Sequence, residues 1–428
     1  MKPRLSAIRC LRILFFFLCL AFFIDRGPYR ALRYSTTGDF STLYAAARCW
    51  LHSENPYSAP ALKHELASAG APDSIVRAQD VNVSVYMPSA MPLMAPVATL
   101  PWRVANPVWC FLALVAFGTS VWLILRQLEL PVHAKWSIAG LVLLFSPTYV
   151  GLFNGNPSVL CISCVALAVC LALNQRPWVS GVLLGVALCF KPQIAFCAVC
   201  LFILWRCWRP LMAGFAIACG AGLTGVTVAS ALGTNWVWLK LERNIALSLA
   251  PGGISDPTPS GPVAWQLLNS ETVASYAIHN ATFAILSVWL FAAALVISYL
   301  LVRTKDVPRS RWRDVSFFTT LTLIVTYHRY YDAQLLLLTI PMLVILWKQN
   351  EPVTFGSLCL CLLFLAFPQQ SVFARALGER ATTASLLQLV LLRQQPVAVL
   401  AMALIIVFAT RGERSGRAER PDSRGSER

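Results

Sequence analysis

Long apolar stretches separated by short polar loops run through most of the chain. After a basic start they cover 13–24, then roughly 107–125, 136–152, 158–173, 178–190, 193–205, 210–231, 281–302, 315–327, 332–347, 353–367 and 383–410. A helix that spans a membrane needs roughly 20 mostly apolar residues, and its backbone polar groups must be bonded within the segment. The pattern therefore predicts an all-α polytopic membrane protein with about twelve transmembrane helices.

The basic loops predict the orientation. If each apolar stretch crosses once, one side of the membrane receives four loops rich in Arg or Lys and also the C-terminal tail. The positive-inside tendency makes this side cytoplasmic and places both termini there. Segments 26–106 and 232–280 are then outside. We expect one polytopic domain over 1–410, followed by a disordered, basic cytoplasmic tail over 411–428.

The two long outer segments contain further predicted elements. Residues 39–52 form a predicted amphipathic helix that lies on the membrane surface. Four prolines scattered over 86–101 favour an irregular segment buried against protein. Trp236 and Trp238 mark another candidate interfacial helix. Because the outer loops are long and the inner loops are short, we expect any chemistry to take place outside.

The composition excludes a nucleic-acid partner. Of the 428 residues, 57% are hydrophobic and only 13% are charged, against about 25% in soluble domains. The net charge of +16 lies largely in the short loops, where it sets orientation, so the expected surroundings are a lipid bilayer. Almost all of the 14 cysteines lie inside apolar stretches, which favours a packing role over a metal, redox or disulfide role.

Asp39 is the first candidate for catalysis. It follows Gly38 shortly after the first apolar stretch, where a loop is expected to turn into a helix. A carboxylate at this position can remove a proton from a hydroxyl group. Asp is also a favoured N-cap residue, so a capping role is the alternative, and one residue can fill both roles.

Charged residues at the outer ends of two later apolar stretches are further candidates. Lys191 interrupts an apolar stretch in "FKPQIAF", and a phosphate is a natural anionic partner for it. The alternative is a lysine that snorkels to the membrane interface. His328, Arg329 and Asp332 lie in "TYHRYYDAQLLLL", where an imidazole and a guanidinium together can hold a phosphate or a sugar. The tyrosines around them are also typical of an interfacial belt.

Motifs for nucleotide binding, for zinc-dependent hydrolysis and for a serine nucleophile are absent from the sequence. It has no glycine-rich loop followed by Lys-Ser/Thr, no H-E-x-x-H and no G-x-S-x-G. We found no cluster of ligands that demands a metal, and we expect no cofactor. An enzyme active outside the cytoplasm then needs an activated substrate that arrives by another route, such as a lipid phosphate.

Five stretches resemble, in this order, the glycosyltransferase 87 family, and the resemblance runs from about residue 38 to 347. They are "GDFSTLYAAARCWLHSENPY", "YMPSAMPLMAPVATLP", "GNPSVL", "GVLLGVALCFKPQIAF" and "YHRYYDAQLLLL". Two positions depart from the family's pattern. Tyr86-Met87-Pro88 stands where Tyr-Pro-Pro is usual, and Gly155-Asn156 stands where Gly-Gln is usual.

The resemblance implies a bundle of the GT-C type in the inner (plasma) membrane, active on the outer side. It implies a hexosyltransferase that moves a sugar, with mannose expected, from a polyprenyl-phosphate donor to a hydroxyl of a glycolipid or glycan acceptor. Asp39 matches the family's base, and Lys191 and His328 match residues expected near the donor phosphate. The other candidate substrate-binding residues are Arg329, Tyr44, Tyr86, Asn156, Gln193 and Asp332.

The expected chemistry agrees with a single base. A glycosidase usually uses two carboxyl groups, because an alcohol leaves poorly without an acid. A phosphate is already a stabilised anion when it leaves, so one base with cations around the phosphate is sufficient, and in-line displacement inverts the anomeric configuration.

The alternatives are a transporter or flippase of a lipid-linked sugar and a non-catalytic membrane scaffold. The sequence shows none of the repeated halves that many transporters have.

Overall fold

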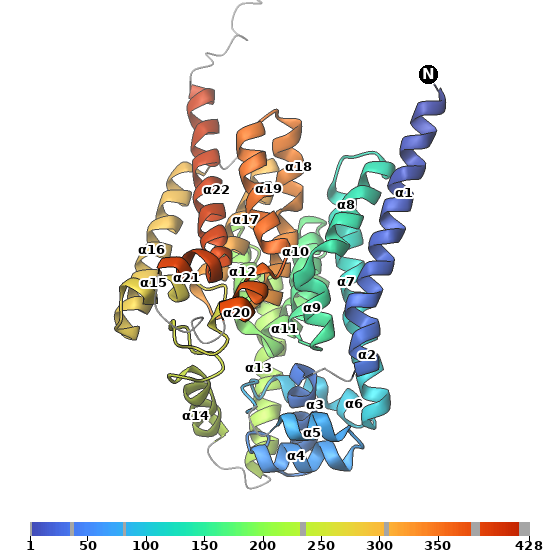
Figure 1. Cartoon of the computed structure of the whole chain (residues 1–428), viewed down its shortest axis with the longest axis vertical. Helices are drawn as coiled ribbons and strands as arrows, with labels where there is room; N and C mark the ends of the chain where they lie inside the picture. Colours follow the sequence, from blue (N-terminus) through green and yellow to red (C-terminus); the bar gives the residue numbers. More distant parts are fainter. Residues whose placement is uncertain are drawn as a thin grey trace, which may run out of the picture. The chain divides into compact units, whose positions relative to one another are not determined.

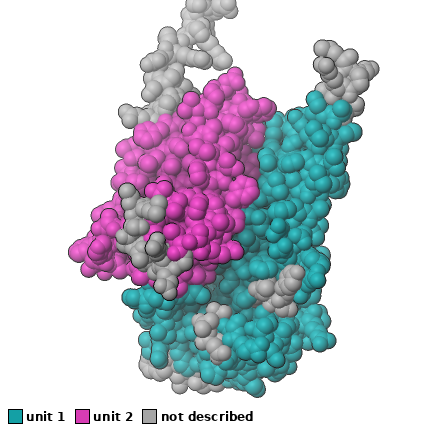
Figure 2. All heavy atoms as spheres, viewed as in Figure 1, with its two compact units in different colours: residues 1–256, 330–335 teal, residues 257–329, 336–428 magenta. Residues whose placement is uncertain are grey.

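Helices build almost the whole molecule. The computed structural model describes residues 2–34, 38–79, 83–231, 237–303, 308–377 and 386–418. Helices account for 81% of the structure, and these ranges contain no strand, which confirms the all-α prediction. The chain forms two compact units, shown in separate colours in Figure 2. Unit 1 comprises 1–256 and 330–335, and unit 2 comprises 257–329 and 336–428. A single domain over 1–410 stays a prediction.

Unit 1 carries the helices from α1 to α14. They are α1 (Lys2–Ile24), α2 (Arg30–Tyr34), α3 (Gly38–Leu51), α4 (Ala59–Ser68), α5 (Asp73–Ala78), α6 (Ala90–Ala98), α7 (Trp102–Gln127), α8 (Val132–Leu144), α9 (Ser146–Phe153), α10 (Ser158–Leu173), α11 (Pro177–Phe190), α12 (Pro192–Leu204), α13 (Trp208–Ala231) and α14 (Val237–Leu249). In Figure 1, α3–α6 gather at one end of unit 1, and the start of α1 and the α7–α8 turn lie at the opposite end. This arrangement fits the predicted alternation of inner and outer loops.

Small residues let α11 and α13 pack closely. Gly181 and Gly185 are four residues apart and therefore share one face of α11. A Cβ atom on Gly181 would lie 2.6 Å from the Cβ of Ala213, and one on Gly185 would lie 2.8 Å from the Cβ of Ile217. Such faces of small residues are typical of helix contacts in membranes. The contact fixes the end of α11, where Lys191 follows.

Unit 2 is a bundle around its last long helix. Its elements are η2 (Ala264–Gln266), α15 (Glu271–Ala277), α16 (Ala281–Val302), α17 (Pro308–Val325), α18 (Ile340–Lys348), α19 (Pro352–Ala366), α20 (Gln369–Leu377), α21 (Leu386–Leu392) and α22 (Gln394–Ala418). Helix α22 contacts α16, α17 and α19. A buried carboxylate, Asp314, joins α17 to α16: it accepts hydrogen bonds from the Tyr299 hydroxyl at 2.8 Å and from Arg303 Nε and Nη2 at 2.7 and 2.8 Å.

Fewer helices are long and apolar enough to span a membrane than there are apolar stretches in the sequence. Five helices in the described part of the chain are long and apolar enough to cross a membrane, or up to seven if each of two bent pairs forms one span. Four shorter apolar helices, among them α10, α11 and α12, have 10–17 residues. These helices fit a membrane protein, while about twelve spans stays a prediction.

The helix predicted over 39–52 is present, but protein covers its apolar face. Helix α3 is present where 39–52 predicted a helix, but it is not laid on a surface: Phe40, Leu43 and Tyr44 are fully buried, as are its three consecutive alanines. Those alanines allow α6 to pack closely on α3. The sequence pattern shows which face is apolar, but it does not show whether lipid or protein covers that face.

The second outer segment and the tail are described only in part. Trp238 lies in α14 and is 53% exposed, whereas Trp236 lies outside the described residues. The side chain of Asn244 on α14 donates hydrogen bonds to the carbonyl oxygens of Tyr57 at 3.2 Å and Ser84 at 2.9 Å, so the two predicted outer segments meet in unit 1. Helix α22 continues to Ala418, and residues 419–428 lie outside the described part, so the disordered tail stays a prediction.

Candidate active site

Asp39 lies in the first turn of α3, one residue after the helix begins at Gly38. Its backbone N–H donates to the carbonyl oxygen of Asn154 at 3.2 Å, and its own carbonyl oxygen accepts from the hydroxyl of Tyr86 at 3.2 Å. A carboxylate in a first turn is favoured by the helix dipole. Asp39 is therefore held by three segments of unit 1 and lies inside the helix, not at the N-cap position.

The turn after α9 brings Asn156 to Asp39. The N–H of Gly155 donates to the carbonyl oxygen of Leu152 at 3.0 Å, and the N–H of Asn156 donates to the carbonyl oxygen of Gly151 at 2.9 Å. This pair of bonds is a Schellman motif, which needs a residue with positive φ after the helix. Gly155 fills that position with φ of 62°, and the indole N–H of Trp109 donates to its carbonyl oxygen at 2.9 Å.

The amide of Asn156 connects two elements of the site. Its Nδ2 donates to Oδ2 of Asp39 at 2.7 Å. Its Oδ1 accepts from the backbone N–H of Ser158 at 2.8 Å and from the Ser158 hydroxyl at 2.6 Å, at the start of α10. Because both ends of the amide are bonded, its orientation is fixed. The amide in turn fixes the Asp39 carboxylate through one oxygen.

Lys191 lies at a break between two helices. The residue before a proline is disfavoured in the helical conformation, and Lys191 has φ of −145° and ψ of 81° between α11 and α12. Its side chain is 11% exposed, and Nζ donates to the Ser158 hydroxyl oxygen at 2.6 Å. It also lies 3.4 Å from Oδ1 of Asp332 and 5.1 Å from the centre of the Tyr331 ring.

A continuous polar network therefore runs through unit 1. It leads from Asp39 through Asn156 to Ser158, where Asp332 and Lys191 meet. The Ser158 hydroxyl has one proton, which is shared between Oδ1 of Asn156 and Oδ1 of Asp332. Four segments carry the network: α3, the α9–α10 turn, the α11–α12 break and the 3₁₀ helix η3 (Tyr330–Thr339). They are far apart in the sequence. We call this set of five residues the Asp39 network.

The two carboxylates of the network have different surroundings. Asp332 is 1% exposed and faces the Lys191 ammonium, so its charge is compensated inside the protein. Asp39 is half-buried, and Oδ1 accepts no hydrogen bond from the residues that the structure describes. A base must reach the proton that it removes. The Oδ1 atom of Asp39 is available to accept a proton, whereas Asp332 is held against Lys191.

Three other predicted residues of unit 1 lie around the network. The Tyr86 hydroxyl contacts the Asp39 backbone, as described above. Tyr44 is fully buried, and its hydroxyl donates to the carbonyl oxygen of Leu100 at 2.6 Å, which places it in the core of the α3–α6 end. Burial raises the pKa of Tyr44. Gln193 lies at the second position of α12, half-buried, and takes no part in the Asp39 network.

His328 and Arg329 belong to unit 2. His328 is fully buried, and its Nε2 is 2.7 Å from the Thr326 hydroxyl oxygen. Its carbonyl oxygen accepts from the N–H of Leu268 at 2.9 Å, and Arg329 Nε donates to the Tyr327 hydroxyl at 2.7 Å. These bonds hold both residues within unit 2. Their convergence with Asp39 and Lys191 on one cavity stays a prediction.

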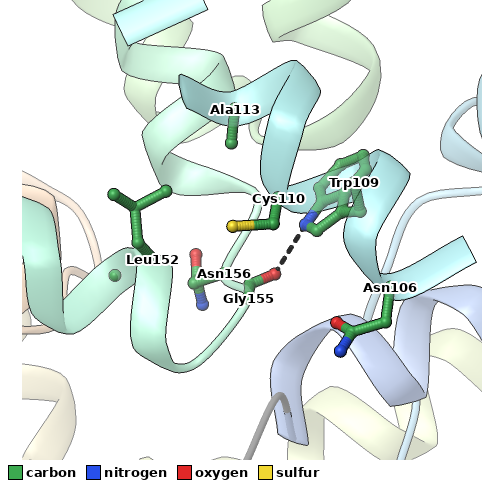
Figure 3. A pocket seen from close by; sticks show the side chains of 8 residues that line it. Asn106, Trp109, Cys110, Ala113, Leu152, Gly155 and Asn156 are labelled. Carbon is green, nitrogen blue, oxygen red and sulfur yellow. Dashed lines mark hydrogen bonds between the residues drawn. The ribbon is translucent and has the colours of Figure 1, made fainter. Parts of the chain in front are cut away.

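A small cavity lies beside Asn156. Figure 3 shows Asn106, Trp109 and Cys110 of α7 on one side of it and Gly155 and Asn156 on the other. Its volume is about 10 Å³, enough for about one water molecule. The Oδ1 atom of Asn106 is buried there and accepts no hydrogen bond from the described residues. The cavity is too small for a sugar, so it is not the place where a substrate reacts.

One group of side chains in the described residues has the donors of a metal site. Ligand atoms of Glu54, His64 and Glu65 lie within 4.8 Å of one another. Glu65 is 3% exposed, and its Oε2 accepts a hydrogen bond from Arg48 Nε at 2.8 Å. Its Oε1 lies 2.7 Å from His52 Nδ1. The Arg48 guanidinium supplies the counter-charge for Glu65. These bonds join α3 to α4, and the expectation of no metal stays a prediction.

Ser158 is the member of the network that sequence reasoning missed. The hydroxyl lies within "GNPSVL", one of the five stretches that carry the resemblance. A signal was present, because Ser158 begins α10 directly after a Schellman turn and a proline. Its role depends on Lys191 and Asp332, which are 33 and 174 residues away in the sequence.

Comparison with protein-family models matches residues 85–326 to glycosyltransferase family 87, which is more than half of the chain. The matched range includes Tyr86, Asn156, Lys191 and Gln193. Asp39 and His328 lie outside it. Comparisons with curated proteins and with solved structures find no match.

Proposed function

The chain belongs to glycosyltransferase family 87, and we propose that it transfers mannose from a polyprenyl-phosphate donor to a hydroxyl group of a glycolipid or glycan acceptor. The reaction takes place on the outer face of the plasma membrane, with both termini in the cytoplasm. The observation that carries this proposal is the hydrogen bonding of the Asp39 carboxylate. One carboxylate oxygen is fixed by Asn156, and the other accepts no hydrogen bond from the described residues.

The proposed step uses Asp39 as the base. Its Oδ1 removes the proton from the acceptor hydroxyl, and the hydroxyl oxygen forms a bond to the anomeric carbon of the donor sugar. The bond between that carbon and the donor phosphate oxygen breaks, and the polyprenyl phosphate leaves with the electron pair. The attack comes from the side opposite to the leaving phosphate, so the anomeric configuration inverts.

Cations around the donor phosphate complete the proposal. An ammonium group has three N–H donors. Two of those on Lys191 are directed to Ser158 and Asp332. The third is left for a phosphate oxygen, while Asp332 keeps the ammonium in place. His328 and Arg329 are the proposed partners from unit 2. Charge-assisted bonds of this kind stabilise a leaving phosphate more strongly than neutral hydrogen bonds do.

The test of the function uses membranes that contain the chain, with radiolabelled polyprenyl-phosphate-mannose or radiolabelled GDP-mannose as donor. The membranes must be washed free of soluble enzymes. We expect label in a glycolipid or glycan product from the lipid donor only, and a product anomer opposite to that of the donor. A transporter would move the lipid donor across the bilayer without forming a new glycosidic bond. Transfer with retained configuration would contradict the single-base mechanism.

A further inference from the structure

Histidine and glutamate side chains gather between α3 and α4, within the predicted outer segment 26–106. Ligand atoms of Glu54, His64 and Glu65 all lie within 4.8 Å of one another, and we call these three residues the α3–α4 cluster. His64 Nδ1 is 3.1 Å from Oε1 of Glu54. A donor set of imidazole with carboxylates suits zinc, whereas magnesium and calcium prefer oxygen ligands alone.

The end of α3 brings the members of the cluster together. Ser53 follows α3 with φ of 71°, and the N–H of Glu54 donates to the carbonyl oxygen of Cys49 at 2.8 Å. A helix that ends in this way turns sharply, because a residue with positive φ stops it. Glu54 therefore lies in the turn after α3, while His64 and Glu65 are consecutive residues of α4. A metal held by all three joins the turn to the second helix.

The charges around the cluster favour a cation. Arg48 Nε donates to Oε2 of Glu65 at 2.8 Å and compensates one of the two carboxylates. Burial raises the pKa of the nearby Cys49 thiol most, and the charges of Glu65 and Glu54 raise it further. Arg48 lowers the pKa of this thiol by less than either carboxylate raises it. The cluster with Arg48 thus keeps a net negative charge when the histidines are neutral.

Glu65 is the fixed member of the cluster, and the other two have room to adjust. Its side chain is 3% exposed and is held by Arg48 and by His52, as metal-binding carboxylates are held by outer side chains. The side chains of His64 and Glu54 are 69% and 32% exposed. With bonds of about 2.0–2.2 Å, the ligand atoms of a tetrahedral zinc site lie roughly 3.4 Å apart. The cluster therefore needs to close by about 1.4 Å at most.

We propose that Glu54, His64 and Glu65 form a zinc site that ties the turn after α3 to α4, with water as the fourth ligand. Zinc binds a neutral imidazole, so it takes the place of the hydrogen between His64 Nδ1 and Glu54, and that hydrogen moves to Nε2. The proposal departs from the expectation of no metal. That expectation came from spacing, and Glu54 and His64 are ten residues apart, which is not a zinc-motif spacing.

The test measures zinc binding by the purified full chain in detergent, prepared without a polyhistidine tag and freed of metal with a chelator. A chromogenic zinc indicator competes for the added metal and reports the stoichiometry and the affinity. We expect about one zinc ion per chain and a higher unfolding temperature with zinc, because a ligand that binds only the folded chain stabilises it. An excess of magnesium should not displace the zinc.

Two substitutions and a control assign the bound zinc to the cluster. His64→Ala removes the nitrogen ligand from an exposed side chain, and Glu54→Gln removes a carboxylate from the turn. We expect each to weaken zinc binding by at least about tenfold and to leave the unfolding temperature without zinc nearly unchanged. His279→Ala is the matched control, because His279 is also exposed and lies outside the cluster. Its affinity for zinc should equal that of the wild type.

The outcomes separate this site from other zinc ligands. Failure of the wild-type chain to bind zinc at about one ion per chain overturns the inference. Unchanged affinity in both His64→Ala and Glu54→Gln overturns it too, since the zinc is then held elsewhere, for example by cysteines. The inference does not rest on the transfer reaction proposed above. An Asp39→Asn chain without transfer activity should still bind zinc, so the two proposals fail separately.

Discussion

The buried pair of Lys191 and Asp332 makes a quantitative prediction about stability. The two side chains are 11% and 2% exposed, and their charged atoms are 3.4 Å apart. At an effective dielectric constant of about 20, two unit charges at this distance attract by about 5 kcal/mol. Removing one partner leaves the other charge buried and uncompensated, so Lys191→Met or Asp332→Asn alone should cost roughly 3–5 kcal/mol.

The double variant should recover most of that loss. In Lys191→Met/Asp332→Asn no charge remains buried, and Asn can still accept a hydrogen bond from Ser158. Replacing a buried ion pair by neutral residues is often close to neutral for stability. We therefore expect the double variant to be at least about 2 kcal/mol more stable than the sum of the two single effects predicts.

The assay is a double-mutant cycle on denaturant unfolding of the purified chain in one detergent. The matched control is Arg30 with Asp25, an exposed pair at 3.7 Å with side chains 38% and 54% exposed. An exposed pair contributes less than about 1 kcal/mol, so the same cycle there should show little coupling. Additive effects at Lys191 and Asp332 would refute the conclusion that the two charges compensate each other inside unit 1.

Three further predictions test the packing and the turn that support the site. A Cβ on Gly225 of α13 would overlap the carbonyl oxygen of Pro88, so Gly225→Ala should lower the unfolding temperature, whereas Gly220→Ala, with open space around its Cβ, should not. Gly155→Ala should cost roughly 1–2 kcal/mol because its φ is 62°, and Gly155→Asn should cost less, by the same unfolding assay. Burial raises the pKa of Cys49, so its thiol should stay protonated at pH 8. Peptide mapping should show it unreactive with N-ethylmaleimide until the chain is unfolded.

Much of the helical framework could be predicted from local patterns. The apolar stretches predict α1, α7, α13 and α16, since each of these helices must present an apolar surface along its length. The break at Lys191 follows from Pro192, which disfavours the helical conformation of the residue before it. The positive φ after α9 follows from glycine in "NGNPS". These features depend on neighbours in the sequence, so the sequence displays them directly.

The connections of the candidate site could not be predicted in this way. Asp39 and Asn156 are 117 residues apart, and Lys191 and Asp332 are 141 residues apart. No periodicity links such pairs, because the contact depends on how several helices pack. For the same reason the sequence suggested that Lys191 is directed to a phosphate, and it did not show that Asp332 compensates its charge. The burial of α3 was missed because an amphipathic pattern does not identify what covers the apolar face.

The central claim is that Asp39 is the base of sugar transfer. The most direct test compares transfer from radiolabelled polyprenyl-phosphate-mannose by membranes with the wild-type chain, Asp39→Asn or Asp73→Asn. Asn keeps the size of the side chain but cannot accept the proton. Asp73 is the matched control because it also lies in the first turn of a helix, α5, within the predicted outer segment 26–106. We predict loss of transfer only in Asp39→Asn, at equal protein levels. Transfer by Asp39→Asn at the wild-type rate would contradict the account.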